Sequence, residues 1–359
     1  MKQLKVAIIG QGRSGWKIHG KNFLVQMDMY KVVAIVDILQ ERLDMVDARY
    51  GAGVDKYSDY KMLFGRTDID LVINSTPSHK HVEISVDLMN HGFNVLCEKP
   101  VARKVSEVDL LIETAKKNSV MFFVFQQSRC ASFYKEMKRI IDSGVLGRIV
   151  QIGISYSGYA RRWDWQTIQG FNGGNLLNTG PHPIDHAVDL FGEGTPQVKC
   201  FMDRANTFGD AEDYCKVVLW GENKPVIDVE ISSCNAYNPY NYNIQGTRGG
   251  LVSDIKSIKY KYFIEEECPE QKLIRTPLTD ADNEPAYCSE QLKWYEEKWE
   301  INSEEFGTFE ERTFNYYKML YKHIVKGEEM VVKLSEVRKQ IAIIEECHNQ
   351  VKLGKTIKV

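Results

Sequence analysis

The sequence predicts an α/β protein in two parts: an N-terminal doubly wound parallel sheet, and a C-terminal α+β domain with a large, mostly antiparallel open sheet. Buried strands alternate with helical segments from residue 4 to residue 125, which is typical of a parallel sheet covered on both faces. A glycine-rich turn follows the first of these strands. In the second half, consecutive strand candidates are joined by short turns, which favours antiparallel pairing.

The composition is that of a globular protein with more than one domain. At 359 residues, with 43% apolar and 26% charged residues, the chain is long enough for two domains, which we expect at residues 1–127 and 128–359. A net charge of -3 argues against nucleic acid as a partner, and no apolar run approaches the roughly 20 residues of a membrane-spanning helix. The start has no signal-peptide layout, and the eight cysteines form no C-x-x-C pair. We therefore expect a cytoplasmic protein with reduced thiols.

The first strand and its turn predict a phosphate-binding cradle. "LKVAIIGQGRSGWKIH" gives a buried strand over about 4–9, and Gly10, Gly12 and Gly15 then follow in G-x-G-x-x-G spacing before a helix. Gly10 allows the tight turn, Gly12 lets the backbone approach a pyrophosphate, and Gly15 lets the helix pack on the strand. The motif alone is a weak signal, because glycine-rich turns are common.

The second strand strengthens the interpretation of that turn as a dinucleotide site. "KVVAIVD" ends at Asp37, where a carboxylate can bind the adenosine ribose hydroxyls and would repel a 2′-phosphate, which favours NAD over NADP. Arg42 is a counter-signal that we interpret as a solvated helix residue. Further alternating elements complete a Rossmann-type sheet. They are strands over 70–76, 93–99 and 120–125, and helices over about 79–91 and 104–117.

Two later strand ends carry polar residues at the edge where such sheets bind ligands. "NSTPSHKH" follows one strand, and "CEKP" follows the next. Lys99 would project toward the nicotinamide, although a solvated loop lysine is the plain alternative; Pro100 makes that alternative weaker by fixing the backbone. His81 is expected to cap or pack its helix more than to touch a ligand. The predicted cofactor-binding residues are Gly10, Gly12, Arg13, Ser14, Gly15, Asp37, Ser75, Thr76, Pro77, His81, Glu98 and Lys99.

The second half is predicted to contain one open sheet between helices. A linking helix is expected over about 131–142 and two closing helices over about 308–326 and 334–352, while the acidic segment 265–306 is interpreted as a solvated helix or flap. Strands are expected over 147–159, 197–205, 214–220, 225–234, 241–247, 250–255 and 258–264.

The stretch "GGNLLNTGPHPIDH" (173–186) concentrates turn residues and polar side chains. A metal site would need three or four converging ligands, and His182, Asp185 and His186 without a nearby cysteine are a modest signal, so no metal is predicted. His186 lies on an apolar helix face, which favours a structural role. His182 and Asn178 are four residues apart across a turn and are candidates for chemistry.

Together these segments resemble the Gfo/Idh/MocA family over essentially the whole chain. The segments that carry the resemblance are "AIIGQGRSGWKIH", Asp37, "NSTPSHKHVEIS", "HGFNVLCEKPVA", "GVLGRIVQI" and "GGNLLNTGPHPIDH". The resemblance implies an NAD-binding Rossmann domain, a substrate-binding domain that pairs into homodimers or homotetramers through its sheet, and a catalytic group of Lys99, residue 178 and His182. The family usually has aspartate where this chain has Asn178, which cannot hold a charge. Asp185 is implied as a substrate ligand.

Those residue types suit proton transfer from a hydroxyl. We assign His182 as principal base and Lys99 as its partner and oxyanion stabiliser, with the reverse assignment open. The absence of an anion at Asn178 favours lower pKa values at both groups.

The segment "YARRWDWQT" (159–167) is interpreted as part of a sugar pocket. Arg161, Trp163 and Trp165 offer flat rings and charged groups to C–H faces and hydroxyls. The alternative is a packed loop with surface arginines.

Three functions follow as hypotheses. The first is an NAD-dependent oxidoreductase acting on a secondary hydroxyl of a sugar, cyclitol or glycoside. The second is a glycosidase or epimerase that uses bound NAD in a transient oxidation–elimination–reduction cycle. The third is a non-catalytic NAD or sugar sensor, against which the retention of Lys99 and His182 argues.

Overall fold

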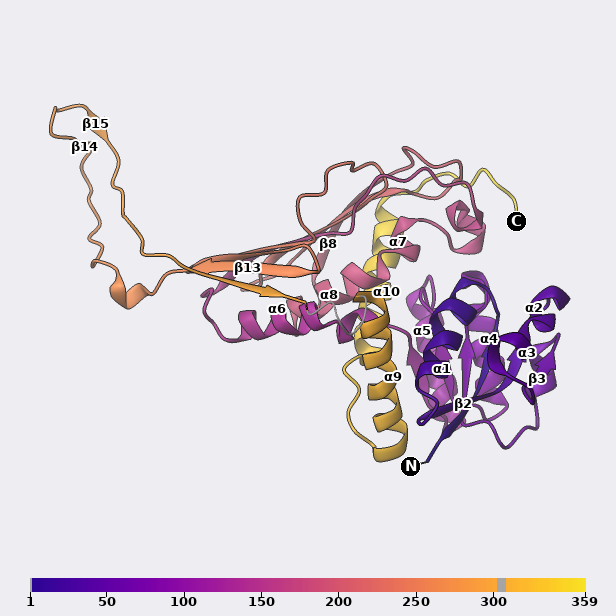
Figure 1. The fold of residues 1–359 in the computed structure, drawn as a ribbon. Helices are drawn as coiled ribbons and strands as arrows, with labels where there is room; N and C mark the ends of the chain where they lie inside the picture. The colour runs from indigo at the N-terminus through magenta and orange to yellow at the C-terminus, as the bar shows by residue number, and fades with distance from the viewer. Residues whose placement is uncertain (1, 302–307) are drawn as a thin grey trace.

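A computed structural model describes residues 2–301 and 308–359, which form two sheets joined by helices and a long projecting arm (Figure 1). The first sheet has six strands, all parallel, in the order β3-β2-β1-β4-β5-β6. Its strands are β1 (Leu4–Ile9), β2 (Tyr30–Val36), β3 (Asp55–Tyr57), β4 (Leu71–Asn74), β5 (Val95–Cys97) and β6 (Phe122–Val124). The strand order reverses between β1 and β4, which is where such sheets bind ligands. The predicted doubly wound sheet is confirmed.

Both faces of this sheet are buried, and β1 shows how. Leu4, Val6 and Ile8 belong to one apolar cluster, whereas Ala7 and Ile9 belong to another on the opposite face. Alternating side chains along a strand point to opposite faces, so a continuous apolar run is the expected pattern for a strand covered twice. The covering segments are the π-helix η1 (Arg13–Gly20) and α1 (Lys21–Val25), α2 (Gln40–Asp44), α3 (Val46–Tyr50), α4 (His81–Asn90) and α5 (Val105–Lys117), with 3₁₀ turns η2 (Tyr60–Leu63) and η3 (Ser78–Lys80).

The second sheet has eight strands in the order β16-β13-β12-β11-β7-β10-β9-β8. Only β7 and β10 pair in parallel, so the predicted large, mostly antiparallel sheet is confirmed. The strands are β7 (Ile149–Ser155), β8 (Gln197–Asp203), β9 (Tyr214–Trp220), β10 (Val226–Ser232), β11 (Tyr242–Gly246), β12 (Gly249–Ser253), β13 (Ser257–Tyr262) and β16 (Tyr295–Glu300).

The segment after β13 corrects one prediction. It is an extended arm that projects from the sheet (Figure 1), with a 3₁₀ turn η7 (Glu265–Glu267) and a two-stranded tip, β14 (Leu278–Thr279) and β15 (Pro285–Ala286). The arm returns as β16, an edge strand that pairs with β13 rather than the solvated helix or flap that we expected over the whole segment. Tyr295 and Trp299 share one face of β16 and are partly buried, whereas Glu296, Lys298 and Glu300 on the other face are exposed. The part of the predicted segment from 302 to 306 lies outside the described residues.

Helices of the second half connect the two sheets. They are α6 (Ser132–Asp142), α7 (Asn175–Asn178), α8 (Pro181–Phe191), α9 (Thr308–Lys326) and α10 (Leu334–Gln350), with 3₁₀ turns η4 (Gln127–Cys130), η5 (Trp165–Thr167) and η6 (Gln169–Phe171). Helix α9 returns to the first sheet, where Tyr316, Tyr317 and Leu320 are buried in the cluster that contains Leu4 and Ile8. The division at residue 127 stays a prediction.

Within the described ranges, no helix is both long enough and apolar enough to cross a bilayer. In the same residues, no three histidine, cysteine, aspartate or glutamate side chains gather as a metal site would require.

Candidate functional site

The glycine turn after β1 has one open position between two closed ones. A Cβ at Gly15 would lie 1.7 Å from the Gly10 carbonyl oxygen, and a Cβ at Gly10 would lie 2.7 Å from the Ser75 carbonyl oxygen. Gly10 also has a φ of +88°, which disfavours other residues. A Cβ at Gly12 would meet only Arg42 Nη1, at 3.8 Å. The turn is thus tightly packed inside and open at Gly12, where a pyrophosphate would approach the backbone.

Asp37 lies beside the glycine turn, where a carboxylate would bind the adenosine ribose. The residue follows β2 and is 4% exposed. Its Oδ2 accepts a hydrogen bond from the Gln11 backbone N–H (2.6 Å), and its Oδ1 accepts one from the Leu39 N–H (2.9 Å). Arg42 Nη1 lies 3.2 Å from Asp37 Oδ2, so Arg42 pairs with the carboxylate instead of being merely solvated as we expected.

The loops after β4 and β5 are joined by buried polar groups. Ser75 Oγ donates to the Ile9 and Gly10 carbonyls at 2.7 and 3.0 Å, which ties β4 to the glycine turn. His81 Nδ1 lies 2.7 Å from the Pro100 carbonyl oxygen and its Nε2 lies 2.9 Å from that of Thr76. Burial lowers the pKa of His81, although the two carbonyl groups oppose this effect, and a neutral ring can donate a hydrogen bond to only one of them. These contacts favour a supporting role for His81 over direct cofactor contact. Thr76 and Pro77 are part of the loop after β4.

Glu98 holds the backbone of Lys99 and is itself held by His19. Its Oε2 accepts from the Lys99 backbone N–H (3.1 Å), and its Oε1 lies 3.1 Å from His19 Nε2. His19 Nδ1 is in turn 2.7 Å from the hydroxyl of Tyr317 on α9. Burial alone would raise the pKa of Glu98, but the hydrogen bond with His19 and the Lys99 charge lower it below its ordinary value. Sequence reasoning did not predict the His19–Tyr317 contact, because α9 is remote in the chain.

Lys99 reaches across to the second half of the molecule. Its Nζ donates to the backbone carbonyl of Asn178 at 2.6 Å. The side chain of residue 178 is not needed for that contact, so replacing the family's usual aspartate by asparagine leaves it in place. Burial lowers the pKa of Lys99 against the opposing effect of Glu98, and the charges of Arg13, Arg312 and Arg162 lower it further.

His182 stands in the first turn of α8, four residues after Asn178 at the end of α7. Its Nδ1 is buried and has no hydrogen-bond partner among the described residues. Burial, and then the charges of Lys99 and Arg312, lower the pKa of His182 well below its ordinary value. The structure therefore brings Lys99 to Asn178, four residues before His182, whose lowered pKa favours the neutral imidazole.

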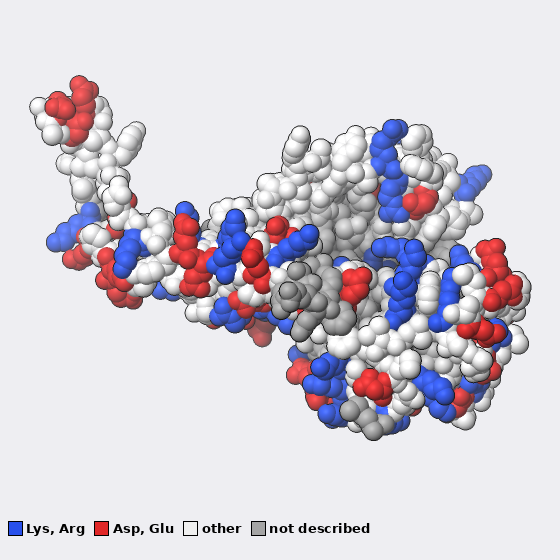
Figure 2. Space-filling view, viewed as in Figure 1, with Lys and Arg blue, Asp and Glu red and all other residues white. Residues whose placement is uncertain are grey.

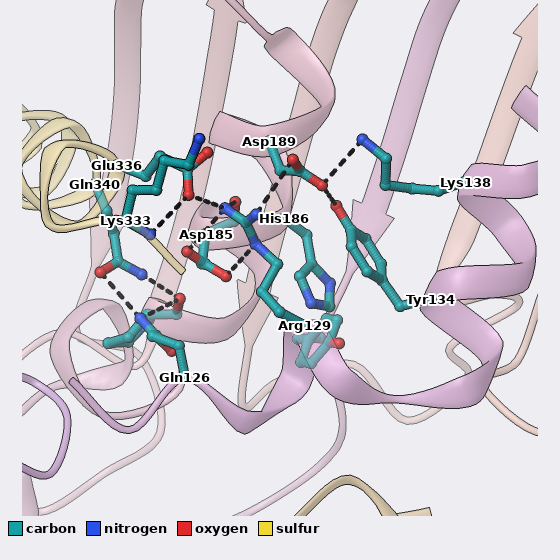
Figure 3. A network of polar contacts seen from close by, with 12 residues as sticks. Gln126, Arg129, Tyr134, Lys138, Asp185, His186, Asp189, Lys333, Glu336 and Gln340 are labelled. Carbon is teal, nitrogen blue, oxygen red and sulfur yellow. Dashed lines mark hydrogen bonds and ion pairs between the residues drawn. The ribbon is translucent and has the colours of Figure 1, made fainter. Parts of the chain in front are cut away.

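Asp185 has a different environment from the one that the resemblance implies. It is fully buried, and Arg129 Nε donates to its Oδ2 at 2.6 Å. The same guanidinium pairs with Asp189 (3.1 Å) and Glu336 (3.5 Å), which ties α8 to η4 and α10 (Figure 3). Burial raises the pKa of Asp185 to about 6, against the opposing charge of Arg129. These contacts favour a structural role for Asp185 over substrate binding.

His186 has the structural role that we expected. It stacks on Tyr134 with ring centroids 3.8 Å apart, and its Nδ1 lies 2.5 Å from the Tyr242 hydroxyl. The ring therefore fixes α8 against the second sheet.

The loop 159–174 crosses toward the first half. Phe171 packs on the His79 ring, with centroids 5.0 Å apart, and Arg103 Nη1 donates to the Gln169 carbonyl (3.3 Å). Trp165 meets Phe171 edge-on at 6.3 Å and is 40% exposed. Trp163 is 79% exposed and Arg161 lies over the Phe208 ring, so neither is brought to Lys99 by these contacts. The sugar-pocket interpretation stays a prediction.

Arg312 is a charged residue that sequence reasoning did not connect with the site. It stands near the start of α9, and its charge lowers the pKa of both Lys99 and His182. No spacing rule connects a C-terminal helix to a strand end in the first half, so only the packing of α9 reveals it.

Comparisons with known proteins agree with the two-part fold. Residues 4–126 match the family model described as oxidoreductase family, NAD-binding Rossmann fold, and residues 134–252 match the Gfo/Idh/MocA C-terminal domain. The chain is 25% identical to 2,7-anhydro-N-acetylneuraminate hydratase of Mediterraneibacter gnavus, over 71% of this chain and 68% of that protein. It is 27% identical to inositol 2-dehydrogenase of Salmonella typhimurium, over 57% of this chain and 59% of that protein.

A solved structure shares the fold over nearly the whole length. It is levoglucosan dehydrogenase in complex with NADH and levoglucosan, with a TM-score of 0.78 and 20% sequence identity over 97% of both chains. At that identity the likeness shows the fold alone.

Proposed function

Since the chain belongs to the Gfo/Idh/MocA family of NAD-binding oxidoreductases, we propose that it transfers hydride between NAD and a secondary hydroxyl of a sugar, cyclitol or glycoside. The similarity to a protein named inositol 2-dehydrogenase supports this substrate class. The observation that carries the proposal is the contact of Lys99 Nζ with the Asn178 carbonyl (2.6 Å), beside His182 and at the strand edge that holds the glycine cradle.

The residues of the cradle fit the cofactor. Gly12 leaves open space beside its backbone, and Asp37 presents a carboxylate at the end of the next strand. When bound, NAD supplies the hydride acceptor at its nicotinamide ring. Gly10, Gly12 and Gly15 would hold its pyrophosphate, and Asp37 its ribose hydroxyls.

His182 is the proposed base for the hydroxyl proton. Its lowered pKa leaves the ring neutral near pH 7, and its unpartnered Nδ1 shows that this nitrogen is not already committed within the described residues. A neutral imidazole can take a proton as negative charge develops on the substrate oxygen.

Lys99 is the proposed stabiliser of that oxygen. One of its N–H groups is used on the Asn178 carbonyl, and an ammonium group carries three donors, so two remain for the substrate. Asn178 fixes the position of the ammonium through its backbone and leaves its side-chain amide for a substrate hydroxyl.

A screen of sugars and cyclitols with NAD, monitored by NADH absorbance, tests the proposal. Parallel assays with NADP test the cofactor choice, since Asp37 favours NAD while Arg42 would suit a 2′-phosphate. Formation of NADH with at least one polyol, and slower turnover with NADP, is expected. Failure of every polyol to yield NADH in a protein that binds NAD would contradict the proposal.

The similarity to a protein named as a hydratase favours one second candidate. In it, the bound cofactor is reduced and reoxidised within one turnover, so that a bond next to the oxidised carbon is eliminated with no net NADH release. Product formation by chromatography without a change in NADH absorbance would favour this cycle over simple dehydrogenation.

A further inference from the structure

The single helical turn α7 lies between a carboxyl group and an ammonium group. At its N-terminal end, the Leu176 backbone N–H donates to Glu212 Oε1 at 3.1 Å. At its C-terminal end, the Asn178 carbonyl accepts from Lys99 Nζ at 2.6 Å. The two ends are joined within the turn, since the Asn178 N–H donates to the Gly174 carbonyl at 2.8 Å. A helical turn directs its free N–H groups toward one end and its free carbonyl groups toward the other, so Glu212 and Lys99 stabilise the same orientation of α7.

Glu212 is packed directly against the backbone of this turn. The residue is 3% exposed, and a Cβ at Gly174 would lie 2.2 Å from Glu212 Oε1. Gly174 has a φ of +108°, a conformation that disfavours other residues. The backbone carbonyl of Glu212 also accepts from the Asn175 N–H at 2.9 Å. Glu212, just before β9, therefore holds the beginning of α7 with both its side chain and its backbone.

The segment that Glu212 holds also receives cations from the first half of the molecule. Lys99 and Arg103 both follow β5, and Arg103 Nη1 donates to the Gln169 carbonyl at 3.3 Å. Each of these cations therefore ends on a backbone carbonyl of residues 169–178. Figure 2 shows Lys and Arg side chains gathered where the two halves of the molecule meet. Because the Lys99 ammonium group binds a carbonyl of α7, its position depends on the position of that turn.

The ionisable groups that act on Glu212 come from several segments. His348 Nε2 on α10 lies 3.9 Å from Glu212 Oε1. Burial raises the pKa of Glu212 to about 7, whereas its hydrogen bond with the Leu176 N–H and the charge of Arg103 lower it, and the charge of Asp213 raises it. A carboxyl group keeps an oxygen acceptor in both protonation states. The contact with Leu176 thus depends on the acceptor oxygen more than on the charge.

We propose that Glu212 is a positioning residue for the reaction: by holding the N–H end of α7, it fixes the Asn178 carbonyl and through it the Lys99 ammonium group. Glu212 acts through the turn, so its effect reaches the reacting atoms only by way of Lys99. The inference rests on the proposed function for the role of Lys99 in the reaction, but the position of Lys99 can be tested without a substrate.

Three variants isolate the side-chain contact. Glu212→Ala removes the acceptor of the Leu176 N–H, whereas Glu212→Gln keeps one in its amide oxygen. Asp213→Ala is the matched control, because Asp213 is 1% exposed and its carboxylate accepts from the backbone N–H groups of residues 205–207 at 2.6–2.8 Å. The control thus removes a neighbouring buried acceptor whose side-chain bonds go to another segment. Thermal unfolding of all three variants measures any general loss of stability.

The first measurement is the rate at which acetic anhydride acetylates Lys99 in the full-length protein at pH 8, without substrate. A carbonyl acceptor favours the ammonium form, which does not react, so we expect acetylation to be at least about threefold faster in Glu212→Ala. Glu212→Gln and Asp213→Ala should match the unmodified protein. Peptide mass spectrometry resolves Lys99, with the exposed Lys116 on α5 as the internal reference. An unchanged rate in Glu212→Ala, or an equal rise in Asp213→Ala, would overturn the inference.

The second measurement is turnover of a polyol that the NADH screen identifies. Glu212→Ala should lower kcat by about tenfold or more with little change in KM for NAD, because a displaced catalytic group slows the chemical step. Glu212→Gln should restore most of the activity. Faster acetylation of Lys99 in Glu212→Ala, with no NADH from any polyol, supports the inference on Lys99 and contradicts the dehydrogenase proposal. Turnover that Glu212→Ala leaves unchanged supports the dehydrogenase and rejects the inference.

Discussion

The cofactor side and the substrate side of the site are built in different ways. The cofactor side uses backbone geometry within one β-α-β stretch: Gly10 and Gly15 pack against carbonyl groups, and Asp37 binds the N–H of Gln11. The proposed substrate side uses side chains from remote segments, with Lys99 after β5 and His182 on α8. A site built from backbone groups depends on a short motif, whereas a site built from side chains depends on how distant elements pack. Substitutions on the cofactor side should therefore lower the stability of the fold or the affinity for the cofactor. Substitutions on the substrate side should lower the rate of the reaction.

The largest expected effect separates chemistry from cofactor binding. His182→Ala and Lys99→Ala should each lower kcat by about 10²–10⁴-fold, because each removes a group that acts on the reacting proton or oxygen. Affinity for NAD, measured by fluorescence titration, should stay within about twofold in His182→Ala, since His182 is on the substrate side. Normal turnover in both variants would show that the catalytic assignment is wrong.

Two glycine substitutions should separate the two properties of the cofactor side, the stability of the turn and the affinity for NAD. Gly15→Ala puts a Cβ 1.7 Å from the Gly10 carbonyl oxygen, so we expect destabilisation by about 3 kcal/mol or more, measured by denaturant unfolding. Gly12→Ala meets only a side-chain nitrogen at 3.8 Å. It should unfold like the unmodified protein while losing at least about tenfold in NAD affinity, because the methyl group occupies the pyrophosphate position. Equal stability of the two variants would contradict the geometry of the turn.

Glu212 offers a pH-dependent test of the turn that presents Asn178. This buried carboxyl accepts from the Leu176 N–H at 3.1 Å, and burial raises its pKa to about 7. A raised pKa favours the folded state at low pH, so this contribution declines as pH rises from about 4.5 to about 7, by up to about 3 kcal/mol. Glu212→Gln should match the unmodified protein near pH 5 and gain relative stability toward pH 8.

Chemical denaturation at several pH values measures that difference, with the exposed Glu222→Gln as control. A constant difference between Glu212→Gln and the unmodified protein from pH 5 to 8 would rule out the raised pKa.

The smallest expected effect concerns the residue in which this chain departs from its family. Asn178→Asp adds an anion near Lys99 and His182, which should raise the pKa of both groups. The acidic limb of the kcat profile should move up by about one pH unit, while Lys99 keeps its contact with the residue 178 carbonyl. An unchanged pH profile would mean that the side chain of residue 178 does not face the two groups.

Much of the molecule was predictable from short-range patterns. The alternation of apolar strands and helices predicted the parallel sheet, and two family models confirm the resemblance carried by the glycine turn and the "CEKP" segment. The arm was predicted less well, since Tyr295–Glu300 is charged enough to suit a solvated helix and becomes a strand only by pairing with β13. Edge strands receive part of their stability from a partner that local sequence does not specify.

The sequence alone determined the fold class, the family and the order of the elements around the glycine turn, because those depend on periodicity and on glycines such as Gly10, whose positive φ disfavours other residues. Only the tertiary structure decided which side chains meet. It placed Asp185 on Arg129, joined Glu98 to His19, and brought the Lys99 ammonium nitrogen to the Asn178 carbonyl. Such meetings arise from the burial of α8, α9 and α10 between two sheets, and long-range packing of this kind leaves no periodic signal in the chain.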